Sequence, residues 1–171
     1  MPASAPSELF TATPVSSQEI VFTDNCDTDP GWTTSGSASD GFWDRGIPVG
    51  GGDRGDAPAD ASGSGFCWQT DDVDGNSDVD GGNVILISPI LDASLPGSIL
   101  SYARWFSNSS GSAPNEDTFV TQISDNGGIT WLDLEIVGPA GDQVNGGWYF
   151  VEFNLDDVPG FNPSSNFRVR F

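Results

Sequence analysis

Residues 66–89 read FCWQTDDVDGNSDVDGGNVILISP, and the fold is predicted outward from this stretch. Two largely apolar runs, 66–70 and 83–89, enclose a segment that holds five aspartates and one asparagine but no lysine or arginine. The second run is almost continuously apolar, which is typical of a strand buried on both faces. The stretch therefore predicts two strands joined by an acidic loop.

The acidic loop carries oxygen-bearing side chains at alternate positions. Like charges so close together repel one another, whereas Ca²⁺ accepts about six to eight oxygen ligands and removes that repulsion. We therefore predict a structural calcium site, with ligands from the loop and from three other polar positions: Asp72, Asp74, Asn76, Asp78, Asp80, Asp24, Asp27 and Asp117. An EF-hand is excluded, because its twelfth position falls on Ile87 and not on a bidentate glutamate. A solvated acidic turn is the open alternative.

Net charge limits the classes of partner. The chain of 171 residues has 25 acidic residues, five arginines, and neither lysine nor histidine, which gives a net charge of −20. Nucleic-acid binding needs a basic surface, an anionic membrane repels such a chain, and no apolar run reaches the roughly 18 residues of a membrane span. The lack of histidine removes the usual triad base and zinc ligand. We expect no nucleic-acid partner, no membrane insertion and no catalytic residues.

The remaining sequence predicts a turn-rich β-protein. Further strands are predicted at 18–23, 98–106, 118–124, 129–136, 148–155 and 166–171. The residues DNGG at 125–128 predict a β-hairpin, because asparagine and glycine tolerate the positive φ of tight turns. In the strand that follows, alternation places Leu132 and Ile136 on one face and Glu135 on the opposite one.

No helical periodicity interrupts these runs. We predict an all-β protein, a two-sheet antiparallel β-sandwich (jelly roll) with little or no helix. Residues 18–171 form its single domain, and residues 1–17, rich in proline, serine and alanine, form an extended linker or docking arm.

Two features predict contacts that hold the loops in place: a long loop that contains two arginines, and a pair of cysteines. Residues 44–65 have almost no large apolar side chains and predict a long loop, which needs pinning. Arg45 and Arg54, paired with nearby aspartates, are candidate anchors. Cys26 and Cys67 predict one disulfide, since the composition suits an extracellular setting; two buried free thiols are the alternative.

Three motifs follow one another along the chain: DVDGG at 78–82 before an apolar strand, RWFSN at 104–108 before an acidic turn, and ISDNGGITW at 123–131. Together they resemble a bacterial extracellular jelly-roll module, similar in outline to MAM-like domains, which are appended to secreted peptidases and large surface proteins. The resemblance covers about residues 24–171. It implies a non-catalytic accessory module with structural calcium and a role in adhesion or glycan contact.

Modules of this kind usually continue past a strand such as FRVRF, here residues 167–171, into one more strand. An open sheet edge is therefore expected, which another chain can fill by strand addition. The segment Leu9–Val15 is the predicted donor. A head-to-tail contact of this kind forms fibres when it does not close.

These observations predict a secreted or cell-surface bacterial protein, namely a calcium-stabilised structural or adhesive module that self-assembles by strand exchange. The expected partners are other copies of the chain, neighbouring extracellular proteins or a polysaccharide. The alternative is a carbohydrate-binding module in which Trp131, Trp43 and Trp148 stack on sugars. A row of exposed, coplanar tryptophan rings would favour that alternative, and wholly buried tryptophans would exclude it.

Overall fold

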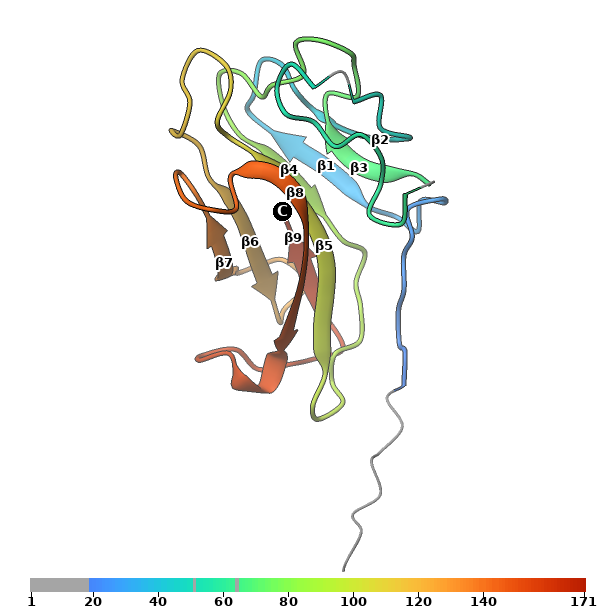
Figure 1. The fold of residues 1–171 in the computed structure, drawn as a ribbon. Coiled ribbons are helices and arrows are strands. Elements are labelled where there is room, and N and C mark those ends of the chain that lie inside the picture. The colour runs from blue at the N-terminus through green and yellow to red at the C-terminus, as the bar shows by residue number, and fades with distance from the viewer. Residues whose placement is uncertain (1–18, 51, 64) are drawn as a thin grey trace, which may run out of the picture.

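The computed structural model describes residues 19–50, 52–63 and 65–171, and almost all of its regular structure is strand (Figure 1). The described residues form these elements: β1 (Thr33–Gly36), β2 (Trp43–Gly46), β3 (Cys67–Thr70), β4 (Val84–Ile87), β5 (Ile99–Ser107), β6 (Phe119–Ser124), β7 (Leu132–Val137), β8 (Asn145–Asn154), the 3₁₀ helix η1 (Leu155–Asp157) and β9 (Arg168–Arg170). The prediction of an antiparallel all-β protein with almost no helix is confirmed. Within the described ranges, no helix is long and apolar enough to cross a membrane.

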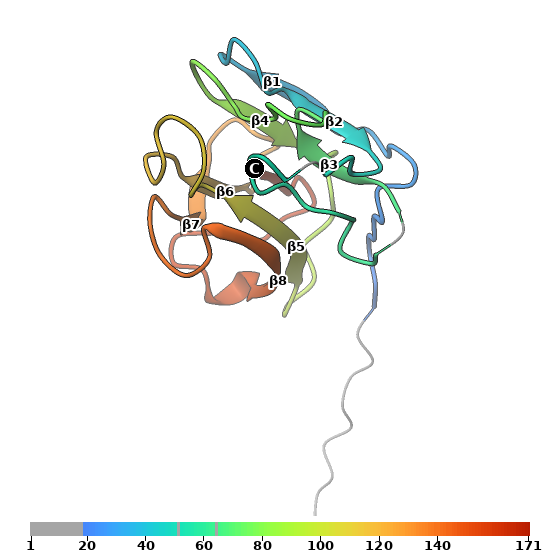
Figure 2. The same cartoon turned by 45° about the horizontal axis from the view of Figure 1, so that its top comes forward.

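Five strands form the largest sheet, in the order β1-β4-β9-β6-β7. Arg170 of β9 is paired with Ile87 of β4 on one side and with Gln122 of β6 on the other. The C-terminus accordingly lies between β4 and β6 in both views (Figures 1 and 2). β9 is therefore an inner strand, and the edges of this sheet, among the described strands, are β1 and β7.

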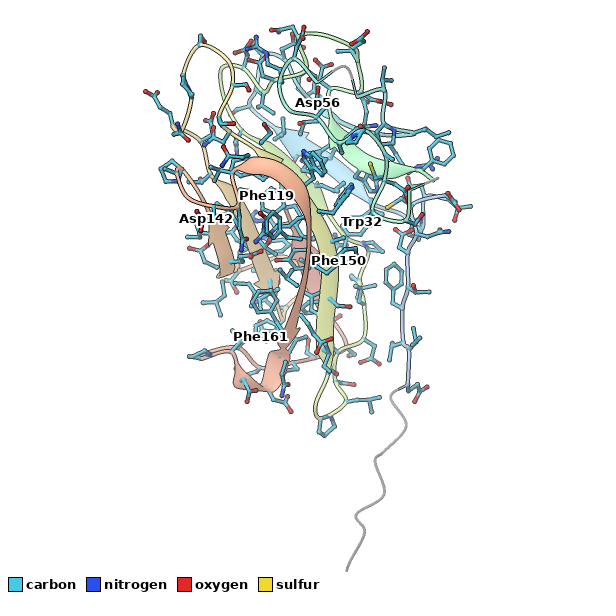
Figure 3. All side chains as sticks on the ribbon, viewed as in Figure 1. Trp32, Asp56, Phe119, Asp142, Phe150 and Phe161 are labelled. Atoms are coloured by element: carbon cyan, nitrogen blue, oxygen red, sulfur yellow. The ribbon has the colours of Figure 1, made fainter. Side chains whose placement is uncertain are left out.

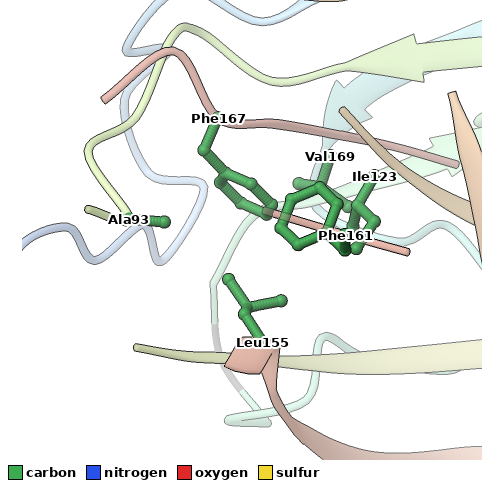
Figure 4. Packing of buried hydrophobic residues seen from close by; sticks show 6 residues of the cluster. All are labelled: Ala93, Ile123, Leu155, Phe161, Phe167 and Val169. Carbon is green, nitrogen blue, oxygen red and sulfur yellow. The ribbon is translucent and has the colours of Figure 1, made fainter. Parts of the chain in front are cut away.

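β5 and β8 pair with each other and pack against the inner face of the five-stranded sheet. Tyr102 of β5 is hydrogen-bonded to Thr121 of β6 at 2.9 Å, and its ring lies 5.0 Å from that of Phe171. The largest buried apolar cluster of the described residues lies between these layers (Figure 4) and comprises Ala93, Ile123, Leu155, Phe161, Phe167 and Val169. The packing is sandwich-like, because each layer buries one face against the other.

The predicted hairpin is confirmed as β6–β7, but its loop is longer than a tight two-residue turn. Side chains close the loop. Ser124 Oγ accepts the N–H of Gly128 at 2.8 Å, and Asn126 Oδ1 accepts the N–H of Thr130 at 2.9 Å. Polar side chains that bond to nearby backbone groups stabilise such loops in place of ladder bonds.

A register shift in this hairpin reverses the predicted faces of β7. Thr121 is paired with Glu135, whereas Gln122 is paired with Asp133, so one residue of β7 has no partner across the strand. Beyond the bulge, Ile136 is 58% exposed and Val137 is 7% exposed. The prediction that Ile136 shares a face with Leu132 is therefore wrong, because Leu132 packs against the core and the bulge shifts the alternation by one residue before Ile136.

The N-terminal part differs from the prediction. Residues 19–23 of the predicted first strand are extended but unpaired, and β1 and β2 occur where no strand was predicted. Ile20 and Val21 are 78% and 53% exposed. The predicted arm 1–17 and its donor segment lie outside the described residues.

Candidate functional site

The acidic loop, residues 71–82, leaves the end of β3 and leads into β4 at the loop-rich end of the molecule (Figure 1). Asp71 has a left-handed φ of 53°, and its N–H donates to the carbonyl oxygen of Phe42 at 2.8 Å. The N–H of Val73 donates to Asp71 O at 2.7 Å and closes the first turn. The start of the acidic loop is therefore fixed to the segment that precedes β2.

The far half of the acidic loop is held by the same segment. The N–H of Asp80 donates to Asp40 O at 3.3 Å. Gly41 has a φ of 79°, and a Cβ atom there would lie 2.5 Å from the carbonyl oxygen of Asp78. Since only glycine combines this φ with so close a contact, Gly41 allows two segments distant in sequence to lie side by side.

Carboxylates gather where these segments meet, and we call the following five the carboxylate cluster: Asp40, Asp44, Asp56, Asp71 and Asp78. Partial burial, and then the charges of the other four carboxylates, raise the pKa of Asp71 above its ordinary value. A raised carboxyl pKa means that the surroundings disfavour the ionised form. Asp56 marks this end of the molecule in Figure 3. The cluster therefore carries negative charge that the fold does not neutralise.

Arg54 supplies positive charge next to the carboxylate cluster. Its Nη2 atom lies 3.4 Å from Asp78 Oδ2 and also donates to Asn76 Oδ1. Ser77 is 4% exposed and donates its hydroxyl to Asp56 Oδ2 at 2.6 Å. The other oxygen of Asp78, Oδ1, is covered and has no hydrogen-bond partner in the described part of the chain. One guanidinium and one hydroxyl thus offset only part of the charge.

Two tryptophans of the β5–β8 sheet hold the long loop that supplies Arg54. Trp105 Nε1 donates to Gly55 O at 2.8 Å, and Trp148 Nε1 donates to Ala59 O at 3.0 Å. The two indole rings meet edge to face, with centroids 5.8 Å apart. The long loop is therefore pinned by indole donors and by Arg54.

The predicted calcium ligands do not converge on one point. In residues 19–50, 52–63 and 65–171, no group of three or more His, Cys, Asp or Glu side chains is placed to hold a metal ion. Asp72 Oδ1 accepts the N–H of Val49 at 3.2 Å, and Asp74 and Asp80 are exposed. Of the predicted aspartates, Asp78 alone belongs to the carboxylate cluster.

The predicted ligands outside the loop lie apart from the cluster. Asp24 accepts the indole N–H of Trp32 at 2.6 Å, and Asp27 accepts the amide of Asn25 at 2.7 Å. Asp117 is exposed. None of these three carboxylates is among the charges that raise the pKa of Asp71.

Sequence reasoning missed Asp40, Asp44 and Asp56 as members of the cluster. All three precede the acidic loop: Asp40 lies before β2, Asp44 lies in β2 and Asp56 lies after it. Their proximity depends on long-range contacts such as the pairing of Asp40 with Asp80, for which the sequence contains no local signal.

The tryptophans do not form an exposed platform. All six are partly buried. The guanidinium of Arg170 lies 4.3 Å from the ring centroid of Trp131 and covers that face, while Trp148 is bonded to the long loop. The Nε1 atom of Trp43 is covered and has no partner among the described residues. The described residues therefore present no row of exposed tryptophan rings.

Cys26 and Cys67 are free thiols, so the predicted disulfide is not formed in this structure. Burial, followed by the nearby Cys26, Asp60 and Asp72, raises the pKa of Cys67 to about 12. Burial, followed by the charge of Asp24, raises the pKa of Cys26 as well. Both side chains are thus held in the thiol form at neutral pH, which makes them poor nucleophiles.

A second charged site, which sequence reasoning also missed, lies between the sheets. Arg104 is 4% exposed and donates twice to Glu135, from Nε to Oε2 at 2.9 Å and from Nη2 to Oε1 at 2.6 Å. Tyr102 donates to Glu135 Oε2 at 2.7 Å, and Gln143 Oε1 accepts from Arg104 Nη2. A usable signal was present, because alternation places Arg104 on the same strand face as the apolar Leu100.

The ionisation of Glu135 follows from these contacts. Burial alone would raise its pKa, but the hydrogen bonds from Arg104 and Tyr102 outweigh burial and lower it. Burial is also the main cause that raises the pKa of Tyr102. Glu135 is therefore an ionised, fully partnered carboxylate, which is the arrangement of a structural ion pair.

Comparison with known proteins gives no match. No protein family, no curated protein and no solved structure corresponds to this chain. The carboxylate cluster and the surfaces of the strands are the features of this chain that bear on its function.

Proposed function

We propose that this chain is a non-catalytic, calcium-stabilised extracellular module with a structural or adhesive role, built on a jelly-roll β-sandwich of the MAM-like kind. The observation that carries the proposal is the carboxylate cluster, in which partial burial and then the charges of four neighbouring carboxylates raise the pKa of Asp71. A divalent cation offsets such charge most directly, because a hard ion accepts carboxylate, amide and carbonyl oxygens.

The donor set fits a hard cation better than a soft metal. The cluster and the acidic loop offer carboxylates together with the amide oxygen of Asn76, and the chain has no histidine. The covered Oδ1 atom of Asp78 has no donor within the described residues, and a ligated ion would supply the missing positive partner. Because the carboxylates are not convergent as they stand, binding requires their side chains to turn inward, which is consistent with the weak sites of extracellular modules.

The non-catalytic part of the proposal is supported by the state of the buried carboxylate. Glu135 is the carboxylate at the inner polar site, and its lowered pKa leaves it no proton to donate near neutrality. Its two oxygens are occupied by Arg104 and Tyr102. A general acid needs the opposite arrangement, with a raised pKa and free access to a substrate.

Calcium binding is tested by thermal unfolding of the protein with millimolar CaCl₂, with MgCl₂ and with EGTA. A ligand at 100 times its dissociation constant stabilises the folded state by about 2.7 kcal/mol, which for a chain of this size raises the Tm by roughly 5–10 °C. We expect that rise with calcium and a smaller one with magnesium. Equal midpoints in calcium and EGTA would refute the calcium site.

We further propose that subunits associate by strand addition. Ile20 and Phe22 lie in an extended segment that makes no hydrogen bonds to any described residue, and they are 78% and 38% exposed. In the described part of the chain, β5 and β8 each have one strand neighbour. Unpaired long edges and an unpaired, extended apolar segment are complementary, since strand addition satisfies both backbones.

The association is tested by light scattering of the purified protein across a concentration series. We expect oligomers that are lost when Ile20 and Phe22 are replaced by asparagine. Ile129→Asn is the matched control, because Ile129 is 83% exposed but lies in the β6–β7 loop. A monomeric wild-type protein at all concentrations would exclude strand addition.

A further inference from the structure

The arginines of this strongly acidic chain fall into two groups. Three of the five are held by carbonyl oxygens or carboxylates of the fold itself: Arg45, Arg54 and Arg104. The other two, Arg168 and Arg170, have no carboxylate oxygen within 4.0 Å in the ranges that the structure describes. In a molecule with a net charge of −20, two adjacent guanidinium groups without counter-ions require an explanation.

Both arginines stand on the outer face of the five-stranded sheet. Phe167 and Val169 are 3% exposed and point inward, so the alternation of β9 places Arg168 and Arg170 together on the opposite face. β9 is flanked by β4 and β6. The two charges are therefore mounted on an inner strand, the most rigid position a sheet provides.

Neighbouring side chains fix the orientation of Arg170. Its Nε atom donates to Gln122 Oε1 at 2.6 Å, and its guanidinium lies over the ring of Trp131, 4.3 Å from the centroid. Arg168 lies beside the same ring, because a Cβ atom built on Gly128 would contact both Trp131 and Arg168 Cδ. A stacked guanidinium loses little rotamer freedom when it binds a carboxylate in bidentate fashion.

The nearest acidic group does not neutralise this pair. Asp133 influences the charge of Arg170, but its carboxylate accepts a hydrogen bond from Gln122 at 2.5 Å and forms no ion pair with either arginine in the described residues. The Nε atom of Arg168 is covered and donates to no described residue. No hydrogen bond or ion pair within the described residues occupies the Nη groups of either arginine.

We propose that Arg168, Arg170 and Trp131 form a docking site for an extended acidic segment of a partner protein. Residues two apart on a strand are separated by about 6.5–7 Å, so two arginines at this spacing match carboxylates at alternate positions of an extended peptide. Each guanidinium then binds one carboxylate. The site is separate from the carboxylate cluster and needs no calcium.

The geometry favours an acidic peptide over an acidic polysaccharide. One face of Trp131 is already covered by Arg170, and its edge is approached by Gly128, so that face is closed to a sugar. A short acidic peptide can bind the two arginines without touching the acidic remainder of the surface. A long polyanion would bring further negative charge against the rest of a chain whose net charge is −20.

The proposal is tested with a fluorescein-labelled peptide of sequence DDVDGNSDVDGG, which is residues 71–82 of this chain and carries aspartates at alternate positions. Its binding to the full chain is followed by fluorescence anisotropy in EDTA at low ionic strength. We expect saturable binding that weakens at least tenfold in the Arg168→Gln/Arg170→Gln variant. Binding should also weaken as salt is added, because the contacts are exposed ion pairs.

Two variants and two ligands keep the outcome decisive. Asp133→Asn removes the nearest competing carboxylate and should tighten binding several-fold, whereas Asp142→Asn makes the same change of charge at an exposed position elsewhere and should leave binding unchanged. A peptide with all five aspartates replaced by asparagine should not bind. The proposal is overturned by equal binding to wild type and the double arginine variant, by binding of the asparagine peptide, or by tighter binding of polygalacturonate than of the acidic peptide.

Discussion

The buried polar site between the sheets and the carboxylate cluster at the loop-rich end have opposite effects on their acidic groups. Glu135 is partly enclosed, yet its pKa is lowered, because Arg104 and Tyr102 donate to both of its oxygens. Asp71 is also partly buried, yet its pKa is raised, because burial is reinforced by four carboxylates. The donors and charges within reach, and not depth alone, thus decide whether a carboxylate stabilises this fold.

Removing the counter-ion of Arg104 at the buried polar site should cause the largest loss of stability. Glu135→Gln keeps the shape of the side chain but leaves Arg104, which is 4% exposed, without its counter-ion. We expect the free energy of unfolding to fall by about 3–5 kcal/mol. Urea denaturation followed by circular dichroism measures it.

Two further variants separate loss of charge from loss of packing. Arg104→Met/Glu135→Met removes both charges and should recover most of the lost stability. Glu152→Gln alters an exposed carboxylate on β8 and should change stability by no more than about 0.5 kcal/mol. A Glu135→Gln protein as stable as the Glu152→Gln protein would show that the ion pair contributes nothing.

At the carboxylate cluster, forcing the segment before β2 away from the acidic loop should cause a smaller loss of stability. Gly41→Ala places a Cβ atom against Asp78 O in a left-handed conformation that strains alanine. A cost of about 1–3 kcal/mol is expected. Gly52→Ala is the control, because its φ of 82° is similar but nothing lies within 4 Å of its Cβ position. Equal costs for the two variants would mean that the close contact with Asp78 is not formed.

A single charge removed from the carboxylate cluster should have an effect whose sign depends on calcium. In EGTA, Asp71→Asn relieves repulsion and should raise stability by roughly 0.2–1 kcal/mol, the scale of exposed charge interactions. In calcium, the same variant should show a smaller calcium-induced rise in Tm than the wild type. Asp142→Asn, an exposed change outside the cluster, should leave both values unaltered, and an identical response of the two variants would argue against the cluster as the calcium site.

The pH dependence of stability distinguishes the two sites by a smaller margin. The raised pKa of Asp71 favours the folded state at low pH, and this contribution is lost as pH rises from the ordinary carboxyl pKa of 3.8 through the higher pKa of the folded state. The lowered pKa of Glu135 contributes stability that is present above 4.5 and is lost as pH falls through the folded pKa. In EGTA, acidification should therefore first stabilise and then destabilise the protein. Asp71→Asn should reduce the first phase, and a wild-type protein that lacks that phase would contradict the argument.

The sequence predicted those elements whose signal is local. The strand face of Leu100 and Tyr102, the apolar run that became β4 and the hairpin at 125–128 all follow from alternation and turn chemistry. β1, with the sequence TTSG, has four exposed residues, so no apolar pattern marks it. The inward turn of Glu135 depends on a bulge between two strands, which is a property of their pairing and not of either sequence.

The candidate site was less accessible to sequence reasoning. The acidic loop was recognisable, because its composition is local, but three of the four carboxylates that surround Asp71 come from β2 and from the segments on either side of it. Their meeting depends on Gly41 and on the pairing of Asp40 with Asp80. Such contacts join residues far apart in the chain and leave no periodic trace.

The edge-to-face arrangement of Trp105 and Trp148 provides an intrinsic optical reporter. Each indole N–H is bonded to a carbonyl oxygen of the long loop, at Gly55 and Ala59. If that loop lifts from the sheet, both indoles exchange a carbonyl for water, and their emission shifts to longer wavelength. Detachment of the loop can therefore be timed by stopped-flow fluorescence on the unlabelled protein.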